Sequence, residues 1–278
     1  MRTKFPLVIT FVSLFAASAI TSLQAQITNG TILYQTNFTG TNGATPDDWD
    51  GVTGGSNTMT IQSDRYVFRR VDSGNALFSW YEGDYVLPDT SLLPASEWTD
   101  YRIDTVLRGS HLANTSTRNG LILRWQDDTG PGTGNQGYHG MLSYVNSTTI
   151  TLSILKDFTV TSGTPGGNGD GTLLESDNFT FSLSDNTDYR LSFEGAGSLL
   201  TLTLSDMDET ISHSISITDT SYTQGNPGLR VYQSSNTRTT SFDSLTVTAV
   251  PEPSTVLLAL VAGGLLLMRR IRMLPVRR

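Results

Sequence analysis

The chain has 278 residues, no cysteine and a formal net charge of −8. The lack of cysteine excludes disulfides, zinc–thiolate sites and thiol nucleophiles. Eleven of the eighteen basic residues but twenty-five of the twenty-six acids lie between residues 26 and 250, so that stretch carries a formal charge of about −14. Because such a surface repels nucleic acid and anionic lipid, neither is expected as its partner.

The first twenty-five residues have the layout of a secretory signal peptide. Arg2 and Lys4 precede an apolar stretch, Phe5–Ile20, and a short polar segment ends at Ala25. We expect cleavage between Ala25 and Gln26, which makes the protein an exported one that uses the secretion machinery. An uncleaved N-terminal anchor is the alternative.

Between residues 26 and 250 the apolar side chains recur at every second position, which is the period of a strand. No stretch there has a helical period of useful length. Thr39–Asn57, Pro88–Pro94 and Thr161–Gly171 are predicted loops, and Ser63–Asp64 and Asn146–Ser147 are predicted hairpin turns. The predicted strands are Thr31–Phe38, Met59–Gln62, Arg65–Arg70, Asn75–Tyr81, Tyr85–Leu87, Trp98–Arg108, Arg118–Gln126, Gly137–Val145, Thr148–Lys156, three strands around Leu191, Leu202 and Ile215, Gly228–Gln233 and Thr239–Val250.

This series of short strands predicts one all-β domain over residues 26–250, an antiparallel two-sheet β-sandwich. In the strand Arg118–Gln126, strict alternation places Leu121, Leu123 and Trp125 on the core face. Ile122 and Arg124 are then expected on the opposite face.

Five short phrases in these strands resemble concanavalin A-like jelly rolls of the laminin-G-like kind. Their order and spacing match across most of Thr31–Val247. The resemblance implies a two-sheet jelly roll whose concave face often handles carbohydrate, so an extracellular polysaccharide is an expected partner. The phrases are Trp98–Tyr101, Asn119–Arg124, Asp188–Leu191, Gly228–Tyr232 and Phe242–Val247.

Four aromatic residues are candidate ligand-binding residues. Trp80 and Tyr81 are adjacent in a strand and point to opposite faces, so one of them is a candidate for exposure in a cleft, where a ring can stack on a sugar. Trp49 is flanked by acids in a loop that suits a sugar or a cation, and Tyr138 is the fourth candidate. The alternative for Trp80 and Tyr81 is a core residue with its neighbour at a sheet edge, and for Trp49 it is a plain surface loop.

No catalytic residues are expected. Retaining glycosidases need two carboxylates about 5–5.5 Å apart, and hydrolases of this fold resemble one another in a Glu-x-Asp-x-(x)-Glu strand. Only Glu82–Asp84 approaches that motif, and no second glutamate follows it. The preferred interpretation is therefore that the protein is not an enzyme. The alternative is a polysaccharide-active hydrolase or lyase with an unfamiliar site, for which the first candidates are Glu82, Asp84, Arg124, Tyr138 and His139.

No cofactor or metal is expected either. Gly166–Gly171 is rich in oxygen ligands but has fewer carboxylates than an EF-hand loop, so calcium is the alternative to a plain surface loop. His111, His139 and His213 are too scattered in sequence to indicate a metal site. The apolar parity of His213 in its strand predicts a core or edge histidine.

The C-terminus combines a rigid Pro251-Glu252-Pro253, an apolar run, Thr255–Met268, and five arginines that include Arg269 and Arg270. The apolar run predicts a transmembrane helix of roughly 21 Å, which is short against a hydrocarbon core of about 30 Å. The arginines should hold its end in the cytoplasm and leave the preceding residues outside.

These three elements in this order resemble the PEP-CTERM sorting signal of bacterial exported proteins. The resemblance implies an exosortase-like processing enzyme as a partner. It also implies membrane anchoring over residues 251–278 before processing, and then a place on the cell surface or in the extracellular matrix. Eight residues follow the arginine pair, where the family often stops sooner. An ordinary C-terminal membrane anchor is the alternative.

Overall fold

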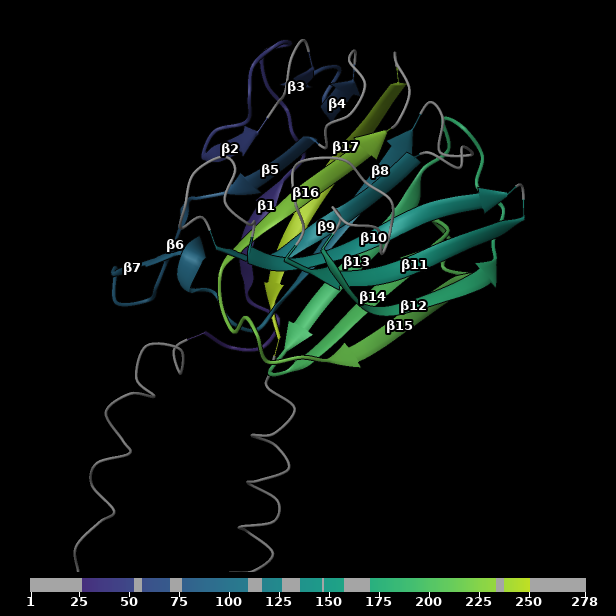
Figure 1. The fold of residues 1–278 in the computed structure, drawn as a ribbon. Coiled ribbons are helices and arrows are strands. Elements are labelled where there is room, and N and C mark those ends of the chain that lie inside the picture. The colour runs from purple at the N-terminus through teal and green to yellow at the C-terminus, as the bar shows by residue number, and fades with distance from the viewer. Residues whose placement is uncertain are drawn as a thin grey trace, which may run out of the picture.

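The computed structural model describes most of the chain between Ile27 and Val250. These residues form two antiparallel sheets that lie face to face, with a small two-stranded ribbon beside them (Figure 1). The prediction of an all-β, two-sheet antiparallel sandwich is confirmed. The described residues are 27–52, 57–70, 77–109, 117–126, 136–146, 148–157, 171–233 and 238–250.

Of the described strands, eight form the first sheet, sheet A, and seven form the second, sheet B. Sheet A runs in the order β15 (Ser212–Thr218), β14 (Leu199–Ser205), β13 (Tyr189–Ala196), β8 (Tyr101–Gly109), β17 (Arg238–Ala249), β4 (Tyr66–Arg70) and β3 (Thr58–Ile61), and β1 (Ile32–Thr36) also pairs with β17. Sheet B runs in the order β12 (Thr172–Thr180), β11 (Thr149–Lys156), β10 (Gln136–Asn146), β9 (Thr117–Gln126), β16 (Asn226–Gln233), β5 (Leu77–Tyr81) and β2 (Trp49–Val52). The ribbon pairs β6 (Asp84–Val86) with β7 (Leu92–Pro94), and a 3-10 turn follows at Ala95–Glu97.

Alternation of side chains places the core between the two sheets. In β8, Tyr101, Ile103 and Leu107 are buried, while Arg102 between them points to the outside. β13 and β14 repeat this pattern, and their inward side chains join one continuous apolar cluster with those of sheet B. Each fully buried apolar side chain contributes about 1.5–3 kcal/mol. In a chain without disulfides, this packing and the strand ladders hold the fold together.

The predicted Ser63–Asp64 turn is confirmed. It joins β3 to β4, and both residues have positive φ, 51° for Ser63 and 57° for Asp64. Positive φ at both central residues is the feature of the type I′ turns that suit the twist of a hairpin. The second predicted turn joins β10 to β11, which pair as expected, although Ser147 lies outside the described residues.

Three described strands lie in segments where no strand is predicted, and each has a weak hydrophobic pattern. β12 forms an edge of sheet B and is exposed or half-exposed along its whole length, so it has no clear alternation to detect. β2 and β7 are only four and three residues long and lie in segments rich in turn-forming residues. Their pairing partners in the fold, rather than their own sequences, make them strands.

The expected face of Trp125 is wrong, and a β-bulge is the reason. Arg124 has a φ of 55°, and the pairing of β9 with β10 shifts its register at this point. A bulge adds one residue to a strand, so the side chains beyond it change faces. Arg124 therefore reaches toward residues of the core side, and Trp125 joins Ile122 on the outward face of sheet B.

Within the part of the chain that the structure describes, no helix is long and apolar enough to cross a membrane. The predicted signal peptide with its cleavage site at Ala25 and Gln26 lies outside that part. The predicted sorting segment also lies outside it, with Pro251, Glu252, Pro253, the helix over Thr255–Met268, Arg269 and Arg270. These expectations stay predictions.

Candidate functional site

Hydroxyl and charged side chains lie next to one another on the outward face of sheet A. They project from five neighbouring strands, β17, β8, β13, β14 and β15, and alternate with core residues along each strand. Strand register arranges most of them in two rows across the sheet. The first row is Thr248, Arg102, Glu194, Thr201 and Ser216, and the second is Thr246, Asp104, Ser192, Thr203 and Ser214.

This face is hollowed into a groove of about 710 Å³. A shorter third row, with Val106, Arg190, Ser205 and Ser212, continues the floor. Glu209, beyond the end of β14, also lines the groove. Aromatic side chains are not among the described lining residues, so a ligand here would be held by hydrogen bonds rather than by ring stacking.

Four of the five charged groups that line the groove form two pairs of opposite sign. Arg102 Nε donates to Asp104 Oδ2 at 2.7 Å, and Arg190 Nε lies 3.8 Å from Glu209 Oε1. The hydrogen bond to Asp104 raises the pKa of Arg102, and the nearby charges of Asp104 and Glu194 act in the same direction. The groove thus offers fixed donors next to fixed acceptors.

Hydroxyl groups beside these charges are linked across the strands. Thr203 Oγ1 lies 2.7 Å from Ser214 Oγ, and Thr201 Oγ1 lies 3.0 Å from Ser216 Oγ. A hydroxyl can donate one hydrogen bond and accept two. Each linked pair therefore keeps capacity for a further partner, and the floor of the groove is suited to a ligand that carries many hydroxyl groups.

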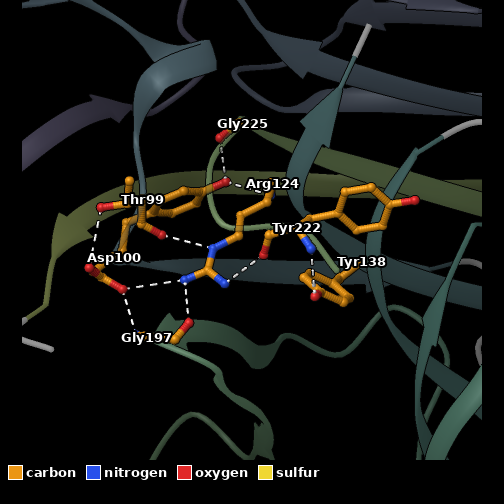
Figure 2. A network of polar contacts seen from close by, with 8 residues as sticks. Thr99, Asp100, Arg124, Tyr138, Gly197, Tyr222 and Gly225 are labelled. Carbon is orange, nitrogen blue, oxygen red and sulfur yellow. Dashed lines mark hydrogen bonds and ion pairs between the residues drawn. The ribbon is translucent and has the colours of Figure 1, made fainter. Parts of the chain in front are cut away.

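A buried polar network is centred on Arg124 (Figure 2). The guanidinium donates to three backbone carbonyls, from Nε to Thr99 O at 2.9 Å, from Nη1 to Tyr222 O at 3.0 Å and from Nη2 to Gly197 O at 2.9 Å. Nη2 also lies 3.3 Å from Asp100 Oδ1, which in turn accepts from the Gly197 N–H at 2.6 Å.

These contacts tie together three segments that are far apart in sequence. Asp100 directly precedes β8, and Gly197 forms the turn between β13 and β14. Arg102 and Glu194 of the first row follow or precede these anchor points by two or three residues. The network around Arg124 thereby connects the segments that flank Arg102 and Glu194 of the first row.

A second set of polar contacts holds the segment between β15 and β16. Tyr138 Oη donates to Asp219 Oδ1 at 2.6 Å and accepts from the Tyr222 N–H at 3.0 Å. Lys156 Nζ donates to Asp219 Oδ2 at 3.2 Å. Burial acts to raise the pKa of Asp219, but the hydrogen bonds from Tyr138, Ser221 and Lys156 together lower it to about 2. Asp219 is therefore ionised at any physiological pH and serves as a fixed acceptor.

The outward face of sheet B is different, because its side chains form a second, smaller apolar cluster of Phe78, Trp80, Ile122 and Trp125, all buried. Phe78 stacks on Trp80 with ring centroids 5.6 Å apart. Beside them, Arg230 Nη1 donates to His139 Nδ1 at 2.7 Å. Burial lowers the pKa of His139 well below its usual value, and the charges of Arg230 and Arg118 add to the effect, so the imidazole is neutral.

All four aromatic residues predicted to bind a ligand are buried. Trp49, Tyr81 and Tyr138 pack in the main core, and Trp80 lies in the small cluster on sheet B with only 3% of its surface exposed. Trp49 Nε1 donates to Tyr34 Oη, and Trp80 Nε1 donates to Glu82 Oε1. The expectation that either Trp80 or Tyr81 is exposed is wrong, because each of the two faces of β5 packs against its own apolar cluster.

The residues first suspected of catalysis do not form one site. Arg124 and Tyr138 belong to the polar contacts around Tyr222, whereas the next residue, His139, points to the other side of sheet B. Glu82 accepts from Trp80, and Asp84 lies on the separate β6–β7 ribbon. The structure therefore does not bring these five side chains together.

The described residues include no group of three or more His, Asp or Glu side chains placed to hold a metal ion. The candidate calcium loop, Gly166–Gly171, lies outside the described residues except for Gly171, and His111 lies outside them as well. The prediction that His213 is a core or edge histidine is confirmed, because His213 lies on β15 at the edge of sheet A. Its Nε2 lies 2.9 Å from Asp177 Oδ2, and its ring stacks on Phe179, so it links the edges of the two sheets.

The groove on sheet A was missed by reasoning from the sequence, although a signal for it exists. Hydroxyl residues alternate with apolar ones in β14, β15 and β17, as in Thr201 and Thr203, Ser214 and Ser216, and Thr246 and Thr248. Such alternation is typical of any strand that has one face exposed to solvent. Only the register of the strands shows that these hydroxyls line up with Arg102 and Asp104.

Comparison with known proteins identifies the fold. No family model matches the chain, and no curated protein matches it. Among solved structures, the metal-free exoplasmic/lumenal domain of VIP36 is similar with a TM-score of 0.53 and 12% identity, over 78% of this chain and 91% of that one. Its Ca²⁺/Man-bound form gives a TM-score of 0.52 and 14% identity, over 78% and 89%. The carbohydrate-binding module CBM66 from Bacillus subtilis gives a TM-score of 0.46 and 17% identity, over 73% and 96%. At the identities of the two VIP36 forms the likeness is one of fold alone, and the chain shares the β-sandwich fold of that domain.

Proposed function

We propose that this protein is an exported, non-catalytic β-sandwich that binds polysaccharide in the groove on sheet A. The observation that carries the proposal is the groove itself, about 710 Å³ of hollow lined by hydroxyls and by paired charges such as Arg102 and Asp104. Fixed donors beside fixed acceptors match the vicinal hydroxyls of a sugar.

The fold supports the proposal, because VIP36 has the same kind of sandwich and has been solved in Ca²⁺/Man-bound forms. The ligands of VIP36 do not identify the ligand of this chain. They show only that this architecture is compatible with holding a sugar.

The non-catalytic part of the proposal rests on the separation of the suspected groups. Glu82 and Asp84 lie away from Tyr138 and Arg124, and Arg124 is occupied by backbone carbonyls. Within the groove, Asp104 is engaged by Arg102, so it acts as an acceptor that orients a ligand.

We also propose that the chain is exported and sorted through its ends. Cleavage would follow Ala25, and Pro251-Glu252-Pro253, the apolar helix over Thr255–Met268 and the Arg269-Arg270 pair would act as a PEP-CTERM signal for an exosortase-like enzyme. Mass spectrometry of the mature protein tests this. A mature form that starts at Gln26 and ends near Pro251 is expected, and a full-length cytosolic form would refute it.

Binding is tested by electrophoresis of the folded domain in gels that contain mixed-linkage β-glucan or glucomannan. Retardation is expected for the wild type, with a loss of about tenfold in affinity for Arg102→Ala and for Asp104→Asn, since each removes hydrogen bonds to the ligand. Arg69→Ala and Asp47→Asn are matched controls, because both residues are exposed and lie outside the groove. Equal loss in the controls would remove the groove from the proposal. Release of reducing ends from either polysaccharide would establish a hydrolase instead.

A further inference from the structure

The two long rows run perpendicular to the strands. Their side chains on β17, β8, β13 and β14 line the groove, which β15 lines with Ser212 of the third row. Each row takes one outward side chain from each of five neighbouring strands, as Arg102, Glu194 and Thr201 do in the first row. Neighbouring strands lie about 4.8 Å apart. That spacing is close to the length of one pyranose unit in an extended chain, so successive sugars along a row would each lie above a new strand.

We infer that the groove binds an extended, uncharged polysaccharide chain that lies across the strands, with one sugar unit above each strand. This inference rests on the proposed function and adds the orientation and the chemical class of the ligand. The five strands from β17 to β15 span four spacings, which is roughly 19 Å. A row therefore has the length of about five sugar units.

The charge pattern selects an uncharged chain. Three carboxylates, those of Asp104, Glu194 and Glu209, line the groove against the two guanidinium groups of Arg102 and Arg190. Both arginines are already beside a carboxylate, Arg102 at 2.7 Å from Asp104 and Arg190 at 3.8 Å from Glu209.

An acidic sugar would bring its own carboxylate to a groove with a surplus of negative charge. It would also approach a stretch of chain that carries a formal charge of about −14. Like charges at short range are repelled, and the cost is largest at low ionic strength. A polyuronate is therefore excluded, whereas a neutral chain meets acceptors and donors in alternation.

Two measurements on the folded domain test this inference. Isothermal titration uses uncharged β-1,4-linked mannan and glucan oligosaccharides of two to eight units. Affinity should rise by about tenfold or more up to roughly five units and change less than about twofold beyond, because further units extend past the row. A plateau already at two units would overturn the orientation.

The second measurement compares neutral glucomannan with alginate in affinity gels at low salt. The wild type should be retarded by glucomannan and not by alginate, and Glu194→Gln/Glu209→Gln should gain binding to alginate while Glu175→Gln, on β12 in sheet B, should not. Alginate bound by the wild type as tightly as glucomannan would overturn the charge argument. If none of the polysaccharides or oligosaccharides binds, the proposed function itself fails, and that outcome is distinct from both others.

Discussion

The two outward faces of the sandwich differ in what their side chains do. The face of sheet A is a polar groove in which Arg102, Asp104 and Glu194 stay accessible among hydroxyls. The face of sheet B buries Trp80 and Trp125 against each other, with ring centroids 5.3 Å apart. One face is thus available to a ligand, and the other is used to stabilise the fold.

This contrast explains why aromatic residues do not mark the candidate site in this sandwich. In a jelly roll an aromatic on the outward face suggests sugar stacking, yet on sheet B such residues form a second core. The groove on sheet A is built from small polar residues that attract little attention in a sequence. Burial, rather than residue type, separates the two roles.

Replacing Trp80 by alanine should give the largest effect. A buried tryptophan that contacts Phe78 and Trp125 is lost, so the free energy of unfolding should fall by about 3–5 kcal/mol. Denaturant unfolding followed by fluorescence measures it. Affinity for glucomannan should be unchanged under conditions where the variant remains folded. A variant of normal stability that no longer binds sugar would make Trp80 a ligand residue and break the comparison.

Gly225→Ala should give the next largest effect, because Gly225 packs on the bulge that turns Trp125 outward. It has a φ of 139°, and a Cβ there would lie 2.4 Å from Trp125 O. We expect a loss of about 1–3 kcal/mol, from strain and displaced backbone. Gly43→Ala is the matched control, since Gly43 also has positive φ, 92°, but has no atom near its Cβ position. Equal losses in the two variants would show that strain alone matters and that the bulge is not closely packed.

The buried histidine on sheet B should make this face sensitive to acid. Burial and Arg230 hold the pKa of His139 well below its unfolded value of about 6.5. The stability that His139 contributes as a neutral group is therefore fully present above about pH 6.5. It is lost as pH falls through that value toward the folded pKa, at up to about 1.4 kcal/mol per pH unit.

Urea unfolding between pH 7 and 5 measures this slope. His139→Gln should flatten it, while His213→Gln, at the edge between the sheets, provides the control for a histidine outside the cluster. An unchanged slope in His139→Gln would show that the acid sensitivity lies elsewhere.

The sequence predicted the sandwich because most strands carry strong alternation, as β8 does with Tyr101, Ile103 and Leu107. It did not predict β12, whose residues at an edge are exposed along the strand, nor the bulge at Arg124. The alternation of apolar and polar residues in a sequence does not show where a bulge adds an extra residue to a strand. The left-handed conformation of Arg124 depends on Tyr101 Oη accepting its backbone N–H, a contact between residues of different sheets.

The groove escaped prediction for a related reason. Thr201, Thr203 and Ser214 lie on two strands, and Arg102 and Asp104 lie on a third that is about a hundred residues earlier. Their alignment depends on register, which is set by the core residues between them. The alternation within each strand can be read from the sequence, but the alignment of these residues on one face of sheet A cannot.

The smallest effect on stability should come from Thr201→Val/Thr203→Val on the face of sheet A. Valine favours strands and keeps the shape of threonine, while Ser214 and Ser216 are exposed and can bond to water instead. The free energy of unfolding should change by less than about 0.5 kcal/mol. Affinity for glucomannan should still fall, since two hydroxyls in adjacent rows are gone.

Denaturant unfolding and affinity gels on the same preparation measure both quantities, with Thr172→Val on the exposed edge strand β12 as the matched control. A loss of several kcal/mol in Thr201→Val/Thr203→Val would mean that the hydroxyl rows are part of the framework of sheet A. Both faces would then stabilise the fold, and the proposed difference between them would be contradicted. Unchanged stability with weakened binding is the result that only a surface reserved for recognition produces.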